Sequence, residues 1–303
     1  MDLAGSAAVR KTCNQERMSI SVRNLTYIYE PGMPGETIAL DDVSFDVEDG
    51  AVLGIIGHTG SGKSTLLQHL NGLIKPTSGD VYVDGECITS GKAKMTEIRR
   101  KVGLVFQYPE YQLFEETVSK DVAFGPKNLG FNEEEIEERV KKAIGLVGLD
   151  YEEIKDQSPF DLSGGMKRRV AIAGVIAMDP KILILDEPTA GLDPSAHRDI
   201  LAMVRRIHDE MGIILIFVSH NMADIAALSD RVMVMSEGKV ALEGTPQEVF
   251  SQGEKLAEMD LGVPPAREIV DLISAKAPKF KSRALTTDEA AEDIKKYLEE
   301  ARG

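Results

Sequence analysis

The stretch "GHTGSGKS", residues 57–64, decides the fold, because its glycines, lysine and hydroxyl residue have the spacing of a phosphate-binding loop. It follows the apolar run "AVLGIIG" and precedes the helical pattern "KSTLLQHLNGLI", the strand–loop–helix order that such a loop requires. Glycines let backbone N–H groups turn toward phosphate oxygens, Lys63 reaches the outer phosphates, and Ser64 offers its hydroxyl to Mg²⁺. The residues expected to contact a nucleotide are Gly57, His58, Thr59, Gly60, Ser61, Gly62, Lys63, Ser64 and Thr65, of which His58 occupies a variable position and receives no chemical role.

Strand patterns surround this loop on both sides. "SISVRNLTYIY" and "ALDDVSFDV" alternate apolar and polar residues, and the turn cluster "EPGMPGE" lies between them. "KVGLVFQ", "KILILDEP" and "GIILIFVSH" are short apolar runs separated by helical patterns. This arrangement predicts an α/β fold with a parallel sheet covered on both faces, in which ligands bind at the carboxyl ends of the strands.

Polar residues follow three of these strands. Asp186 ends "KILILDEP" and can hold Mg²⁺ through water, and the adjacent Glu187 can act as general base toward an attacking water. His220 follows another strand, where it can contact the terminal phosphate and orient water. Gln107 ends "KVGLVFQ" and can reach both metal and water. The sequence therefore predicts a hydrolytic centre beside the phosphate-binding loop.

The stretch "LSGGMKRRV", residues 162–170, has the chemistry of a second phosphate-binding site. Ser163 and two glycines stand where a helix should begin, and three cations follow at positions 167–169. Free backbone N–H groups and a positive helix end attract phosphate. Met166 is the unusual member, because its thioether cannot donate a hydrogen bond and accepts one only weakly.

An aromatic residue near the first strand could stack on an adenine ring. Tyr29 is our candidate for this contact, and Tyr27 competes for the same role. Packing in the core is the alternative for either ring.

Composition limits the classes of function. The 303-residue chain carries a net charge of −15, which argues against nucleic acid as its main partner, since that affinity rests on cationic contacts. Its two cysteines lack metal-ligand spacing, and a reducing cytosol is the simplest environment for them. No apolar run approaches the ~20 residues that a membrane helix needs, and the first residues show no signal-peptide core.

Changes in pattern suggest the domain boundaries. Residues 1–17 are expected to be a flexible lead-in, and residues 18–250 a nucleotide-binding domain with a helical insertion at about 111–178. Residues 251–303 form a separate helical extension and a candidate dimerisation unit. Within it, Thr286 and Glu289 have the spacing of a capping box.

Taken together, these motifs resemble the nucleotide-binding subunits of ABC transporters. "GHTGSGKS", Gln107, "LSGG", "LILDEP", "GLD" at residues 191–193 and His220 follow one another in the order of that family. The resemblance implies an α/β P-loop NTPase fold of the ABC type. Such a fold has a mixed-sheet core, an N-terminal antiparallel β subdomain, a helical subdomain and, here, a small C-terminal α extension. It also implies an ATPase that uses ATP and Mg²⁺, with Asp193 in the D-loop.

A narrower resemblance is carried by "QLFEETVSKDVAFGPKNLG" and "QSPFDLSGG". These stretches are similar to the energy-coupling factor ATPases, which drive uptake of vitamins and of cobalt or nickel ions. The tail "LGVPPAREIVDLI" with "ALTTDEAAEDI" is similar to the extension of the same group. The long turn "YEPGMPGETIALDDV" resembles the second of its two paired ATPases.

The family resemblance also implies partners. Two such subunits pair head to tail, so that Ser163, Gly164, Gly165 and Met166 would serve the ATP held by the partner's loop. Both a heterodimer and a homodimer are compatible with the sequence. Because the family usually has glutamine in place of Met166, the site completed by this chain is expected to be the weaker of the two.

Membrane subunits complete such a complex. A transmembrane scaffold subunit and a substrate-binding membrane subunit would hold the chain at the cytoplasmic face of the membrane. The scaffold would dock near "YPEYQLFEETV", with Tyr108, Tyr111 and Phe114. Local packing of that loop is the alternative for these aromatic residues.

Two other classes of function are considered. A soluble ABC-type ATPase that acts on DNA or ribosomes usually has long coiled-coil insertions or two cassettes in one chain, and this chain has neither. A small-molecule kinase would explain the phosphate-binding loop but not "LSGG" or "GLD".

Overall fold

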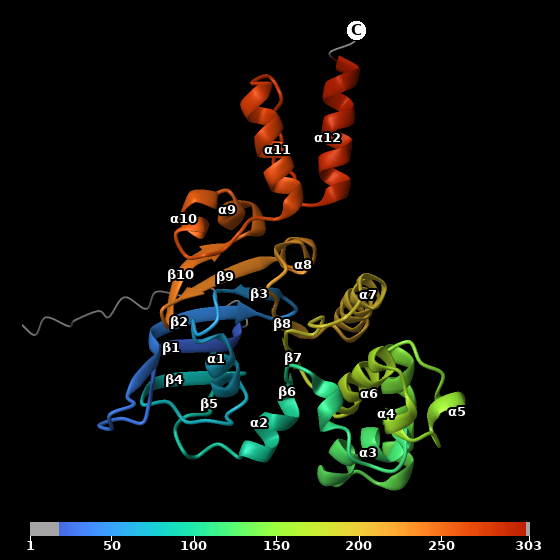
Figure 1. Cartoon of the computed structure of the whole chain (residues 1–303). Coiled ribbons are helices and arrows are strands. Elements are labelled where there is room, and N and C mark those ends of the chain that lie inside the picture. The colour runs from blue at the N-terminus through green and yellow to red at the C-terminus, as the bar shows by residue number, and fades with distance from the viewer. Residues whose placement is uncertain (1–17, 301–303) are drawn as a thin grey trace, which may run out of the picture.

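A computed structural model describes residues 18–300 and contains two sheets (Figure 1). The predicted lead-in, with Cys13, lies outside the described residues, and Cys87 is a free thiol. The first sheet is antiparallel, in the order β2-β1-β4-β5. Its strands are β1 (Met18–Tyr29), β2 (Thr37–Glu48), β4 (Ser78–Val83) and β5 (Glu86–Cys87).

The second sheet has six strands in the order β10-β9-β3-β8-β7-β6. They are β3 (Val52–Ile56), β6 (Val102–Val105), β7 (Ile182–Asp186), β8 (Ile214–Val218), β9 (Arg231–Ser236) and β10 (Lys239–Gly244). All neighbours are parallel except β9 and β10, so the sheet is mixed. Every residue of β3, β7 and β8 is buried, as expected for strands covered on both faces. The predicted strands and their parallel arrangement are confirmed.

Helix α1 (Lys63–Leu70) follows the phosphate-binding loop but is shorter than the predicted helical pattern. Gly72 has a φ of 66°, and its N–H donates to the carbonyl of His69. The N–H of Leu73 donates to the carbonyl of Gln68. These two bonds form a Schellman motif, which ends the helix at a residue that tolerates left-handed backbone.

A helical region lies beside the β6–β7 edge of the mixed sheet (Figure 1). Short helix α2 (Met95–Lys101) precedes β6. The region itself contains η1 (Pro109–Gln112), α3 (Val118–Asn128), α4 (Glu133–Leu146), α5 (Tyr151–Ile154), η2 (Pro159–Asp161) and α6 (Gly164–Ile176). Helix α4 buries Val140 and Ile144 on one apolar face, its C-cap Val147 is also buried, and a capping box at Asn132 starts it.

The remaining helices follow β7. They are α7 (Pro194–Met211), α8 (Met222–Leu228), α9 (Pro246–Phe250), α10 (Gly253–Ala257), α11 (Pro265–Lys276) and α12 (Thr287–Glu300). Helices α11 and α12 form a hairpin that projects from the rest of the molecule (Figure 1). Its small core includes Val270 and Phe280. The amide of Thr286 donates to Glu289, whose own amide donates to the Thr286 hydroxyl, so the predicted capping box is confirmed.

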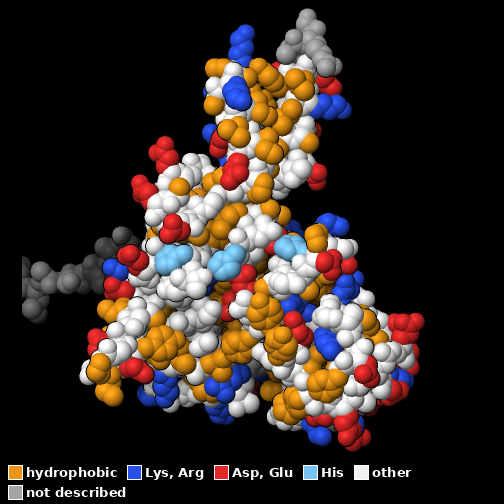
Figure 2. All heavy atoms as spheres, in the orientation of Figure 1, with side chains coloured by type: hydrophobic (Ala, Val, Ile, Leu, Met, Phe, Trp, Pro, Cys, Tyr) orange, Lys and Arg blue, Asp and Glu red, His pale blue; other side chains and the backbone are white. Residues whose placement is uncertain are grey.

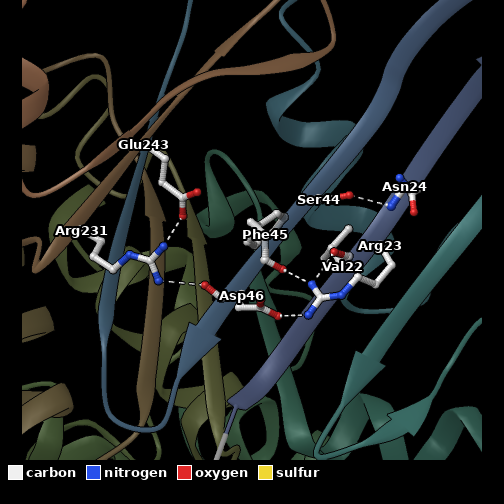
Figure 3. A network of polar contacts seen from close by, with 8 residues as sticks. All are labelled: Val22, Arg23, Asn24, Ser44, Phe45, Asp46, Arg231 and Glu243. Carbon is white, nitrogen blue, oxygen red and sulfur yellow. Dashed lines mark hydrogen bonds and ion pairs between the residues drawn. The ribbon is translucent and has the colours of Figure 1, made fainter. Parts of the chain in front are cut away.

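Polar contacts join the antiparallel sheet to the β9–β10 pair (Figure 3). Arg231 donates to the backbone carbonyl of Asp46 at 3.0 Å and forms an ion pair with Glu243. The carboxylate of Asp46 pairs in turn with Arg23 at 2.7 Å. Burial raises the pKa of Glu243, and the charge of Arg231 opposes this shift. These contacts fix the antiparallel sheet against β9. Strand β9 pairs with β3, and β3 leads into the phosphate-binding loop.

Candidate active site

The phosphate-binding loop turns between β3 and α1 with backbone angles that require glycine. Gly62 has a φ of 98°, and a Cβ on it would lie 2.4 Å from the carbonyl oxygen of Ala39. A Cβ on Gly57 would lie 2.4 Å from the carbonyl oxygen of Met235. Helix α1 has no side-chain cap and no acidic residue in its first turn. Its first N–H groups are therefore free to bind an anion.

The ammonium of Lys63 lies at the centre of the loop. Its Nζ donates to the carbonyls of Gly57 at 2.7 Å and His58 at 2.9 Å. Burial lowers the pKa of Lys63, while the carboxylates of Glu187 and Asp186 raise it. The site therefore balances one cation against two acidic groups.

Asp186 and Ser64 form the oxygen-rich part of the site. The Ser64 hydroxyl donates to Oδ2 of Asp186 at 2.9 Å, and burial raises the pKa of Asp186. Within residues 18–300 no cluster of three or more His, Cys, Asp or Glu could hold a metal by itself. One hydroxyl and one carboxylate suit Mg²⁺, which keeps several waters and shares substrate phosphates as ligands. The residues thus fit the predicted ion.

Glu187 adopts a left-handed backbone with a φ of 52°, and its amide donates to the carbonyl of Val218 at 3.1 Å. Its Oε1 lies 3.1 Å from Nε2 of His220, without the geometry of a hydrogen bond. This oxygen is therefore one of three buried side-chain polar atoms in residues 18–300 that have no hydrogen-bond partner. Burial raises the pKa of Glu187 to about 7, the backbone N–H of His220 opposes this shift, and the charge of Asp186 adds a smaller increase. Such a group can take a proton from water.

One pocket of about 530 Å³ brings the predicted residues together. Tyr29 and Gln107 line it, and Tyr29 approaches the Thr65 hydroxyl at 3.2 Å. Tyr27 does not line it, because it packs edge-on between Tyr29 and His69 against the sheet core. The other predicted residues in the lining are Thr59, Gly60, Gly62, Lys63, Ser64, Thr65, Asp186, Glu187 and His220. Gly57, His58 and Ser61 belong to the loop but not to this lining.

The second predicted phosphate site lies elsewhere. Ser163 is the N-cap of α6, and its hydroxyl accepts from the amide of Met166 at 3.3 Å. Ser163 and Gly164 are exposed, whereas Met166 is half-buried against the core of the helical region. None of these residues lines the pocket at the phosphate-binding loop. Asp193 caps α7, and the amides of Ala196 and Ser195 lower its pKa.

Two of the three cations after "LSGG" do not form a phosphate site, which corrects the sequence interpretation. Arg168 is 1% exposed and pairs with Glu110, and Arg169 contacts the carbonyl of Val147 and the carboxylate of Asp199. The second turn of α6 directs both side chains toward the interior. The exposed N-terminus of α6 and the half-buried Lys167 remain for an anion.

A buried carboxylate that the sequence reasoning missed lies behind the site. Asp224, at the start of α8, contacts Nε2 of His197 at 2.9 Å and accepts from the Ser219 hydroxyl at 3.3 Å. The Thr189 hydroxyl donates to it at 3.5 Å. These contacts join the segments after Glu187 and before His220 to α7. The only sequence signal is an acidic residue within the apolar pattern "MADIAAL".

Comparison with known proteins gives consistent results. The ABC transporter family model matches residues 40–190. The "Energy-coupling factor transporter ATP-binding protein EcfA2" of Clostridium perfringens is 56% identical over 277 residues, which cover 91% of this chain and 97% of the relative. The solved structure of cbiO1 from the same species, described as part of the ABC transporter complex cbiONQ, is 38% identical with a TM-score of 0.72. It covers 87% of this chain and 97% of that chain. A dimeric ATP-binding cassette, MJ0796, bound to ADP and Pi is 29% identical with a TM-score of 0.66 and covers 75% and 98%.

Proposed function

The chain belongs to the ABC transporter family, as an ATP-binding subunit of the energy-coupling factor type, and we propose that its ATP hydrolysis drives uptake of a micronutrient, either a vitamin or a cobalt or nickel ion. The observation that carries the hydrolytic role is the buried Oε1 of Glu187, which has no hydrogen-bond partner and belongs to the same pocket as Asp186 and Ser64. The micronutrient class rests on the sequence resemblance alone.

Each polar group in the pocket has a role in this reaction. Lys63 and the free amides of α1 hold the phosphates. Asp186 and Ser64 would hold Mg²⁺, which neutralises charge that develops on the phosphate oxygens. Glu187 accepts a proton from the attacking water, and the neutral ring of His220, whose pKa is lowered by burial, orients that water. Gln107, two residues after β6, lines the same pocket.

Pairing with a second ATPase subunit would give the α6 N-terminus a ligand. Its amides lie outside this chain's own pocket, and Ser163 and Gly164 are exposed. We propose a head-to-tail pair, either a heterodimer or a homodimer, in which these amides bind the partner's ATP. The α11–α12 hairpin, within the extension proposed at residues 251–303, is a second candidate contact. It exposes Ile269, Leu272 and Leu298. Figure 2 shows hydrophobic side chains gathered on the visible face of this projecting hairpin.

A groove of about 590 Å³ supports the proposed docking of a transmembrane scaffold subunit. Phe114 and Phe124 line it and pack edge-on with ring centroids 4.9 Å apart. They are 57% and 44% exposed, and exposed apolar side chains that gather in one groove mark an interaction site. None of the helices between residues 18 and 300 has the length and apolar character needed to traverse a bilayer. We therefore propose attachment to the cytoplasmic face through this groove, in a complex that includes a substrate-binding membrane subunit.

Purification from native membranes tests the proposal. We expect the tagged chain to retain a second ATPase and at least one integral membrane protein, and vesicles containing the complex to take up a vitamin, cobalt or nickel in the presence of ATP. Uptake that the Glu187→Gln variant does not diminish would contradict the assigned role. Recovery with ribosomes or DNA would favour the alternative, a soluble ABC-type ATPase.

A further inference from the structure

Arg168 is a buried cation in α6, the helix that begins within "LSGG", and it makes four hydrogen bonds. Its Nε and Nη2 donate to the two carboxylate oxygens of Glu110 at 3.0 and 2.7 Å. Its Nη1 donates to the carbonyls of Pro188 at 3.1 Å and Ala190 at 2.8 Å. Such a bidentate pair is strong and fixes the geometry of both partners. Arg168 therefore holds two separate segments at once.

The first segment lies between the active site and the groove. Glu110 is in η1, three residues after Gln107, which lines the nucleotide pocket. Gln112, Leu113 and Phe114 follow after Tyr111 and line the groove. A body that enters the groove would therefore contact Gln112, the last residue of the short helix that carries Glu110.

The second segment contains the catalytic base. Pro188 follows Glu187 directly, and the amide of Ala190 donates to the carbonyl of Glu187 at 3.2 Å. Arg168 thus holds the turn in which Glu187 adopts its left-handed backbone. The ring of Tyr108 lies 6.0 Å from the Arg168 guanidinium and close to Gly191, which adds an aromatic contact between the same two segments.

We propose that Arg168, through Glu110, is a positioning residue that couples occupation of the groove to the placement of Glu187. When residues 109–114 shift, Glu110 moves the Arg168 guanidinium with it. The guanidinium in turn displaces the carbonyls of Pro188 and Ala190, to which it is hydrogen-bonded. Because Arg168 belongs to α6, the same shift also reaches the N-terminus that would bind the partner's ATP. This inference deepens the proposed function and rests on it for the identity of the body in the groove.

Arg168→Lys is the decisive variant. Lysine keeps the positive charge, but its ammonium lacks the planar fork and cannot hold Glu110 and both carbonyls at once. Glu110→Gln breaks the pair from the other side at constant volume. Arg169→Lys is the matched control. Arg169 is the next residue of α6, and its contacts are with Val147 and Asp199 rather than with Glu110 or the turn after Glu187.

The first measurement uses the full chain alone, by hydrogen exchange with and without ATP. In the wild type and the control, ATP should slow exchange at residues 108–114 as well as at 187–190. In Arg168→Lys and Glu110→Gln, ATP should still slow exchange in the phosphate-binding loop but not at 108–114. Equal responses of Arg168→Lys and Arg169→Lys would overturn the coupling.

The second measurement uses the reconstituted complex, with kcat and KM determined for the ATPase pair with and without the membrane subunits. We expect Arg168→Lys to reduce the stimulation of kcat by the membrane subunits about tenfold, within the usual range of coupling between sites, and to leave KM unchanged. A structural role alone would lower kcat equally in both states, and that result would refute the inference. If the wild-type rate of hydrolysis is the same with and without the membrane subunits, the transport function is refuted instead. The hydrogen-exchange measurement would then still test the coupling through Arg168.

Discussion

Replacement of Glu187 by glutamine removes the proposed base at nearly constant shape. The amide cannot take a proton from water, so hydrolysis should fall by roughly 10²–10⁴-fold, or about 3–5 kcal/mol in the barrier. Lys63 and the amides of α1 do not depend on this carboxylate for their contacts to the phosphates. ATP affinity should therefore stay within about twofold of the wild type, a change below 1 kcal/mol.

The same substitution should stabilise the metal-free protein at high pH. Burial raises the pKa of Glu187 from an ordinary 4.5 to about 7, so between these values the folded state binds more protons than the unfolded state. Stability contributed by this group is then lost as the pH rises through that window. Each pKa unit corresponds to about 1.4 kcal/mol, so the buried carboxylate costs about 3 kcal/mol at pH 8. Glutamine carries no such charge.

Two assays test these numbers. Turnover is measured in a complex whose partner site is already inactive, so that only one base contributes. Urea unfolding with a chelator is then compared at pH 4 and pH 8, where Glu187→Gln should match the wild type at the lower pH and exceed it by about 1–3 kcal/mol at the higher. Hydrolysis near the wild-type rate would refute the role of Glu187 as base. A stability difference that is equal at both pH values would refute the assigned pKa.

Substitutions at four further residues probe the rest of the protein. Lys63→Ala should weaken ATP binding about 10–100-fold, since a charge-assisted hydrogen bond contributes roughly 1.5–3 kcal/mol, and an unchanged affinity by nucleotide titration would count against this contact. Tyr29→Ala should weaken it about tenfold through lost stacking whereas Tyr29→Phe should not, and equal losses would exclude stacking. Asp224→Asn should lower the melting temperature by about 5–10 °C, because a buried carboxylate with three partners is replaced; a calorimetric change under 2 °C would contradict its structural role. Met166→Gln should raise turnover of the paired complex about fivefold, because the amide adds a hydrogen bond of ~1 kcal/mol that a thioether cannot make, and an unchanged rate would make Met166 neutral.

The phosphate-binding loop was predictable from the sequence because its constraints are local. The left-handed angles at Gly60 and Gly62 are tolerated by glycine, and the strand before and the helix after the loop are adjacent in sequence. Asp186, Glu187 and His220 were predictable for a related reason. Parallel strands all end at one edge of the sheet, so polar residues after β7 and β8 must meet there.

The contacts that hold this site together were not predictable in the same way. Glu110 and Arg168 are 58 residues apart, and Asp224 lies 27 residues from His197. Nothing in a local pattern selects one acidic partner for a cation among the 50 acidic residues of the chain. Only the packing of η1 and α6 on the turn after Glu187 makes that choice.

The burial of two of the three cations after "LSGG" could have been predicted from the local sequence. A cation at a helix N-terminus suggests phosphate binding. However, residues four apart lie on the same face of a helix, so a cation four residues before a core residue faces the core. Arg168 is four residues before Ile172, and Arg169 is four before Ala173, and both apolar residues are buried. The helical period therefore indicated that these two cations face the interior. The proposed phosphate binding at this segment would therefore depend on the exposed N-terminus of α6, and Arg168 fixes this helix to the turn after Glu187 through the carbonyls of Pro188 and Ala190.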